Sequence, residues 1–165
     1  MATYPTHFYN IYIGNSFSED TISSVNYFAS NLGNTAWFNV LSSYYEIDSE
    51  ANIVPVSNIS QFQQFIQVPP PNNSGNLRDS DIQNLIFQLI LNNSVIELDS
   101  NAVYTVFFDG QLNATSADGR TWPTDWCSYH SSFQLSSFDG RLPFVFFFSL
   151  LLNLICVILI QINCN

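Results

Sequence analysis

Short apolar runs alternate with amphipathic stretches along most of the chain, and the two patterns predict strands and helices. Residues Thr6 to Ile13 (THFYNIYI) are rich in aromatic and β-branched side chains and end at Gly14, as is typical of a strand. Residues Ala102 to Phe108 (AVYTVFF) are almost continuously apolar, which predicts a strand that is covered on both faces. Trp126 to Leu135 is predicted to be the last strand, whereas the pattern of Gln61 to Val68 is ambiguous.

The first helix is predicted from a cap followed by apolar positions at helical spacing. Ser16 and Ser18 are candidate caps, and the acids Glu19 and Asp20 follow them in the first turn. Gly33 occupies the position at which a left-handed residue ends many helices. The apolar positions in between are Ile22, Val25, Ala29 and Leu32.

The second helix has the clearer pattern. Ser80 and Gln83 have the spacing of a capping box, and Asp79 and Asp81 lie beside the positive end of the helix dipole. One apolar stripe follows and stops at Asn92-Asn93; its members are Ile82, Leu85, Ile86, Leu89 and Ile90.

The segments around these elements are shorter. Trp37 to Tyr45 is expected to be a short helix that runs into an extended segment, and Glu46 to Val56 a strand with a polar turn at Asp48 to Asn52. Pro69 to Gly75 and Asp109 to Pro123 are expected to be loops. Strands interleaved with helices predict the α/β (α+β) class, with one mixed-sheet domain and packed helices over residues 6–140.

Composition narrows the classes of function. The 165 residues allow one domain, and 47% hydrophobic residues are enough for a core. Thirteen Asp and Glu residues oppose three Arg residues, and the net charge of −10 excludes nucleic acid as a partner, because phosphate binding needs clustered cations. The sequence contains no phosphate loop and no dinucleotide fingerprint, so no cofactor is predicted.

The end of the chain has a different composition. Phe144 to Ile160 (FVFFFSLLLNLICVILI) carries no charge, and residues 143–162 are interpreted as a hydrophobic tail and a candidate transmembrane helix. As a helix, this run spans about 25 Å, which is short of the ~30 Å hydrocarbon core of a bilayer. Arg141 would place the preceding domain in the cytoplasm. The alternative is read-through into AT-rich non-coding DNA, which encodes runs of Phe, Leu, Ile and Asn.

Cysteines and glycosylation sequons indicate an extracellular protein, with one inconsistency. The odd number of cysteines makes Cys127 either half of a disulfide or a buried thiol, because Cys156 and Cys164 lie in the tail. Nothing in Met1 to Thr6 resembles a signal peptide. Asn-X-Ser/Thr sequons, which suit a secreted glycoprotein, begin at Asn58, Asn72, Asn92 and Asn113.

Candidate metal and nucleophile sites are incomplete. His7 and His130 are the two histidines, and Cys127-x-x-His130 has a weak ligand-like spacing. A zinc site needs three or four protein ligands, and strand positions three apart point to opposite faces, so no metal site is predicted. Ser131 and Ser132 follow His130, but the chain has no Gly-x-Ser-x-Gly elbow, and a catalytic triad is not expected.

Paired carboxylates and exposed aromatic residues are the remaining candidates. The group Glu46, Asp48 and Glu50 is interpreted as a turn, the pair Asp79 and Asp81 as helix capping, and Asp118-Gly119 as a turn. Trp122 and Trp126 flank Pro123 in an expected loop, where they either stack on a sugar ring or pack into the core.

The order of these segments resembles the EXORDIUM (phosphate-induced protein) family. The likeness covers about Thr6 to Gln134 and rests on the aromatic strand-plus-glycine opening, the later Trp-Phe and Tyr segment, and the Cys-x-x-His pair. The residues that carry it are Phe8 to Asn15, Trp37, Phe38, Tyr44, Leu77 to Ile82, Asn101 to Val106, and Trp126 to His130. Ser128 stands where the family usually has glycine.

The resemblance implies a secreted protein of the cell surface or wall that acts in growth signalling. Cell-wall carbohydrate or a surface protein is then the expected partner. Family members continue to a helix with His-Glu-x-x-Glu, which this sequence lacks, so a truncated, non-catalytic domain is expected. Two alternatives stay open: a degenerate zinc-metallopeptidase-like domain without its metal helix, and a tail-anchored membrane protein.

Overall fold

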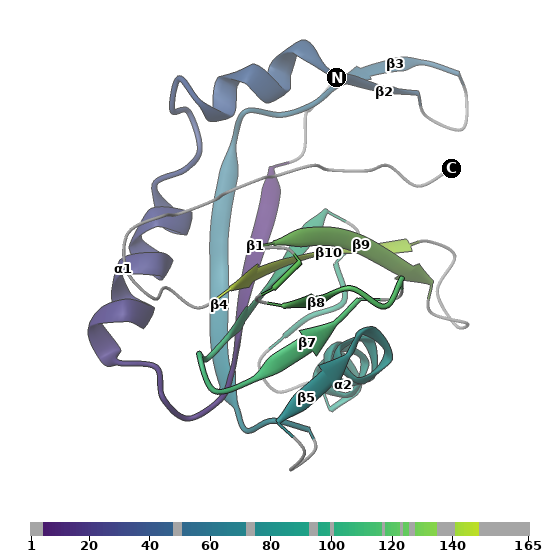
Figure 1. The fold of residues 1–165 in the computed structure, drawn as a ribbon. Helices are drawn as coiled ribbons and strands as arrows, with labels where there is room; N and C mark the ends of the chain where they lie inside the picture. The colour runs from purple at the N-terminus through teal and green to yellow at the C-terminus, as the bar shows by residue number, and fades with distance from the viewer. Residues whose placement is uncertain are drawn as a thin grey trace.

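A five-stranded sheet forms the centre of the protein (Figure 1). The computed structural model describes residues 5–47, 51–71, 75–92, 96–99, 101–116, 118–122, 124–125, 128–134 and 141–148. The strand order is β4-β1-β6-β10-β9, in which the first four strands run parallel and β9 is antiparallel to β10. Their bounds are β1 (Thr6–Ile13), β4 (Ser60–Val68), β6 (Ala102–Phe108), β9 (Tyr129–Gln134) and β10 (Arg141–Phe148). The predicted α/β class with a mixed sheet is confirmed.

Two helices, α1 (Glu19–Ser30) and α2 (Asp79–Leu91), cover opposite faces of this sheet. Tyr12 of β1 donates a hydrogen bond to Asn26 of α1, whereas Ile11 and Ile13 pack in one cluster with Ile86 of α2. Because neighbouring residues of a strand point to opposite faces, the two helices lie on different sides. The domain therefore has three layers.

The central strands β1 and β6 are almost fully buried, as their apolar runs predict. Stacked aromatic rings join them on both faces: Tyr12 lies 4.9 Å from Phe107 on the α1 side, and Tyr9 lies 5.5 Å from Tyr104 on the α2 side, between ring centroids. Such pairs add about 0.5–1.5 kcal/mol to the burial of their area. Burial and ring stacking hold β1 and β6 in place, so the residues that directly follow these strands are held in place as well.

Helix α1 begins as predicted but ends earlier. The Ser18 hydroxyl accepts a hydrogen bond from the Thr21 amide at 3.2 Å, and Asn31 is the C-terminal cap. The prediction that Gly33 is a left-handed terminator is wrong, since its φ is not positive. A Cβ at Gly33 would lie 2.6 Å from the Ser60 amide nitrogen, so glycine permits the close approach of β4 instead.

Helix α2 carries the predicted apolar stripe, with Ile82, Ile86 and Ile90 buried, but its capping differs. The cap is Arg78, whose amide donates to the Asp81 carboxylate at 2.9 Å. The predicted Ser80–Gln83 box is therefore wrong. Gln83 donates to Asp79 at 3.1 Å instead, because Asp81 already stands three residues after the true cap.

Smaller elements surround the sheet. A 3₁₀ helix, η1 (Phe38–Ser43), leads into β2 (Tyr45–Ile47), which pairs antiparallel with β3 (Ile53–Pro55). The predicted loop from Asp109 to Pro123 instead contains two strands. Together with β5 (Asn76–Arg78), β7 (Asn113–Thr115) and β8 (Thr121–Trp122) form a second sheet, because Ala114 and Trp122 bury their side chains in the core cluster.

The start of the predicted hydrophobic tail belongs to the main sheet. Phe144 to Phe148 lie in β10 and pair with β6, so this part is a strand and not a helix, and β9 is not the last strand. A short apolar run fits a buried strand as well as a helix, which explains the error. The predicted boundary at residue 140 falls between β9 and β10. Residues 149–162 of the tail lie outside the described residues, and within those described no helix is long and apolar enough to span a bilayer.

Candidate functional site

The carboxyl ends of β1 and β6 form the place where open α/β sheets most often bind ligands. The chain leaves β1 toward β4 on one side and returns to β6 on the other, so this is the topological switch point. Asp109 follows β6 and is only 5% exposed. Its carboxylate accepts the amides of Asn15 at 3.0 Å and Ser16 at 3.2 Å with one oxygen, and that of Gln111 at 3.0 Å with the other.

This carboxylate closes the switch point to anions. Amides after the first strand bind phosphate in nucleotide-binding folds, but here the Asn15 and Ser16 amides bind Asp109. A phosphate would also meet its negative charge. Asp109 was not predicted as a site residue, although an acidic residue directly after a buried strand is a signal that the sequence contains.

Gly14 leaves room for the Asp109 carboxylate. Its φ is +129°, and a Cβ would lie 2.2 Å from the Asp109 carboxylate oxygen. Other residues rarely adopt this backbone conformation, and none has room for its side chain here. The glycine of the strand-plus-glycine opening thus has a structural role.

A second polar cluster lies at the amino ends of the same strands. The His7 ring nitrogen Nδ1 pairs with Asp99, whose other oxygen accepts the Asn101 amide at 2.7 Å. The Tyr104 hydroxyl donates to the Glu97 carbonyl at 2.7 Å, and burial raises its pKa above the usual range. These bonds hold the connection that leads into β6. Among the described residues, no three His, Cys, Asp or Glu side chains are grouped to hold a metal ion.

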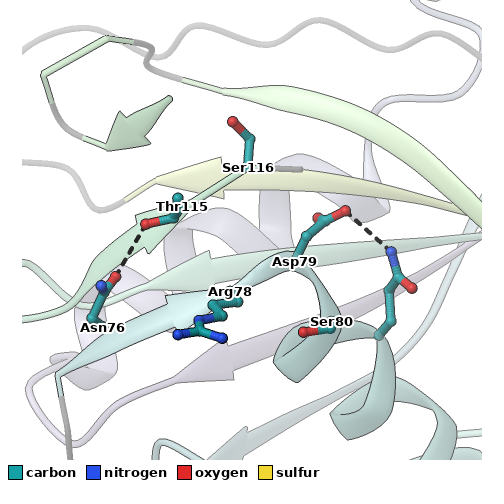
Figure 2. Close-up of a pocket in the computed structure, with 7 residues that line it drawn as sticks. Asn76, Arg78, Asp79, Ser80, Thr115 and Ser116 are labelled. Atoms are coloured by element: carbon teal, nitrogen blue, oxygen red, sulfur yellow. Dashed lines mark hydrogen bonds between the residues drawn. The ribbon is translucent and has the colours of Figure 1, made fainter. Parts of the chain in front are cut away.

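An open polar depression of about 570 Å³ lies beside the amino end of α2 (Figure 2). It combines residues from β5, α2, β7 and the turn after β7. Two internal hydrogen bonds order it: Thr115 donates to Asn76 at 3.3 Å, and Gln83 donates to the buried carboxylate of Asp79 at 3.1 Å. All lining residues are polar: Asn76, Arg78, Asp79, Ser80, Gln83, Thr115 and Ser116.

The depression offers donors and acceptors in one place. Arg78 supplies cationic donors, Asp79 supplies a carboxylate, and the Ser80 hydroxyl and two amides supply both functions. The Thr115 and Ser116 hydroxyl groups donate within the protein and remain acceptors. Opposite charges in a small polar site suit a ligand that carries many hydroxyl groups and no large net charge. From the sequence, Asp79 was predicted only to be a capping residue, and the depression was not predicted, because nothing indicated the strand β7.

The sequons occupy different environments. Asn92 at the end of α2 and Asn113 at the start of β7 are exposed. Asn58 is half-buried, and its side-chain amide donates to Asn39 at 2.7 Å. Asn72 lies outside the described residues.

The weak ligand-like pair of Cys127 and His130 is described only in part. His130 lies in β9, where its backbone pairs with Val145, and Cys127 lies outside the described residues. The half-disulfide therefore stays a prediction. Ser131 and Ser132 are neighbouring positions of the same strand.

The carboxylates that were interpreted as structural have different outcomes. Asp81 caps α2, as expected, whereas Glu46 lies in the strand β2 and not in a turn, and Asp48 and Glu50 fall outside the described residues. Asp118 accepts hydrogen bonds from Arg120 and Ser116, and this contact lowers the pKa of the Asp118 carboxyl far below its usual range.

Of the two roles left open for Trp122, packing into the core is the one that the structure shows. Its indole is 8% exposed in the core cluster, because pairing of β8 with β7 turns it inward. Trp126 lies outside the described residues. Trp37, by contrast, is 49% exposed on the segment before η1.

Comparison with known proteins gave no match: no family model, no curated protein sequence and no solved structure matches this chain.

Proposed function

We propose that this protein is a non-catalytic binding module of the EXORDIUM type, which acts at the cell surface or wall and binds a hydroxyl-rich carbohydrate in the polar depression. The observation that carries the proposal is the set of side-chain donors and acceptors, all from polar residues, that faces the depression together with apolar atoms of the same residues. The segment Leu77 to Ile82, one of those that carry the family resemblance, supplies Arg78, Asp79 and Ser80 to it.

Sugar hydroxyl groups donate and accept hydrogen bonds at the same time, and the depression provides both kinds of partner. Asp79 accepts and Arg78 donates, while the hydroxyl groups of Thr115 and Ser116, whose protons are donated within the protein, can accept from the ligand. A volume of about 570 Å³ falls within the range of small-molecule sites, about 300–1,000 Å³.

Charge favours a neutral carbohydrate over an acidic one. The whole chain carries −10, which repels a polyanion over distances of about a Debye length. Arg78 is one cation beside one carboxylate, so it does not reverse that balance locally. Neutral wall oligosaccharides are therefore the expected ligands.

The test is a calorimetric titration of the full chain with neutral wall oligosaccharides (xyloglucan, cellulose and mannan fragments) and with oligogalacturonate. Gln83→Ala removes a lining amide and should weaken binding about three- to tenfold, the equivalent of one hydrogen bond of about 0.5–1.5 kcal/mol. Gln88→Ala, on the exposed part of the same helix, is the matched control and should leave the Kd unchanged.

Two results would contradict the proposal. One is the absence of heat with every neutral oligosaccharide at millimolar concentration. The other is binding that Gln83→Ala and Ser116→Ala both leave intact. Chromatography of the ligand after incubation tests the non-catalytic part, because new reducing ends would show cleavage.

A further inference from the structure

Beyond its first residue, where Gly33 approaches the Ser60 amide, the outer edge of β4 pairs with no strand in the part of the chain that the structure describes. β4 is the first strand in the order of the main sheet and pairs with β1 alone (Figure 1). It is 9 residues long. An edge of this length presents a row of backbone N–H and C=O groups that can pair with another strand.

The devices that usually protect such an edge are almost missing. Residues 60–68 (SQFQQFIQV) contain no charged residue and no proline. One irregularity is present: Phe8 pairs with Phe62 and Tyr9 with Gln64, so Gln63 forms a bulge. Beyond the bulge, Gln64 to Val68 continue as a regular run.

We propose that this edge pairs antiparallel with the β4 edge of a second copy of the chain, forming a two-fold dimer with one continuous sheet. Self-pairing suits the side chains. Those that β4 exposes are Gln61, Gln63, Gln64, Phe65 and Gln67. Glutamine amides both donate and accept, so they complement themselves across a two-fold axis.

The charge distribution favours β4 as the place at which two copies meet. Two copies that each carry −10 repel one another, but β4 itself contains no acidic residue that would oppose the contact. Phe65 is 44% exposed although its ring packs 6.1 Å from that of Tyr12, and pairing would cover its exposed part. The dimer does not use the polar depression, because none of the residues that line the depression belongs to β4.

The experiment measures the mass of the full chain by light scattering from about 1 to 200 μM, together with hydrogen exchange of the β4 amides. We expect a dimer at high concentration and slower exchange of these amides in the dimer. Gln64→Glu, which is isosteric, should raise the dimer Kd about tenfold or more, because it brings a charge into the interface of both copies. Gln88→Glu adds the same charge on exposed α2 and should leave it within about twofold.

Three outcomes would overturn the dimer. A monomer at every concentration is the first, and an equal effect of the two variants is the second. The third is slow exchange of β4 at all concentrations in a monomer, which would show that another strand covers the edge. Circular dichroism of both variants confirms that a change in mass does not come from unfolding.

Discussion

Gly14→Ala introduces a methyl group at the most crowded point of the carboxyl edge. The backbone there has a φ of +129°, and the new Cβ would lie 2.2 Å from the Asp109 oxygen and 2.4 Å from its carboxyl carbon. The conformation alone costs about 1–3 kcal/mol. Displacing Asp109 also breaks its bonds to the Asn15 and Ser16 amides, each a hydrogen bond to a charged group of about 1.5–3 kcal/mol.

The expected loss is therefore about 4 kcal/mol or more, a large part of the stability of a small domain, about 5–15 kcal/mol. Urea unfolding followed by tryptophan fluorescence measures it, with the buried Trp122 as a reporter. Gly75→Ala is the control, because its φ is +67° but nothing lies within 4 Å of the added Cβ. Gly75→Ala should lower the free energy of unfolding only by the cost of a positive φ for alanine, about 1–2 kcal/mol.

Equal losses in the two glycine variants would refute the steric argument. A double-mutant cycle separates the two terms further. In an Asp109→Gly background, which also removes the Asp109 Cβ that would lie 2.9 Å from the new methyl group, Gly14→Ala should cost no more than the free energy of its backbone conformation, and an undiminished loss would show that Asp109 is not the obstacle.

The other predictions concern α1, alkaline pH and glycosylation. Asn26→Ala leaves the buried Asn10 amide and the Tyr12 hydroxyl without their acceptor, so the free energy of unfolding in urea should fall by about 2 kcal/mol or more; no change would contradict the network. Burial raises the pKa of Tyr104 above its ordinary 10.0, so the unfolded chain loses the proton first; stability is complete below pH 10 and falls as the pH rises further. Tyr104→Phe should make the urea midpoint decrease less between pH 8 and 11.5. An equal decrease in the variant and in the unmodified protein would contradict the raised pKa of the Tyr104 phenol. In a secretory host, Asn113→Gln should reduce the mass lost on deglycosylation, and an unchanged mass would exclude a glycan at this exposed site.

Strong local patterns predicted the centre of the fold. The continuous apolar runs of β1 and β6 and the apolar stripe of α2 predict which residues are buried, because the spacing of apolar residues follows directly from the geometry of a strand or a helix. Ser18 could be identified as a cap for the same reason, because its bond reaches only to Thr21. Local information was sufficient at these positions.

The errors arose where distant contacts decide the structure. Gly33 lies beside Ser60, and that contact, not the end of α1, explains the glycine. β7 is too short for a pattern and exists because it pairs with β5, almost forty positions earlier in the chain. The apolar run that begins at Phe144 forms a strand because it pairs with β6.

The candidate site was hidden for the same reason. The depression joins residues 76–83 to residues 115 and 116, and no spacing in the sequence relates the two groups. Asp79 and Ser80 were visible only as helix-start signals. Their second role required the neighbouring strand.

An NMR titration of the isotope-labelled chain with neutral wall oligosaccharides can locate the binding surface residue by residue. Saturable amide shifts confined to residues 76–83 and 113–116, with the sugar recovered intact, are the predicted result. A spectrum unchanged at saturating sugar, or shifts centred on Trp37 and the segment around it, would show that the polar depression is not a carbohydrate site.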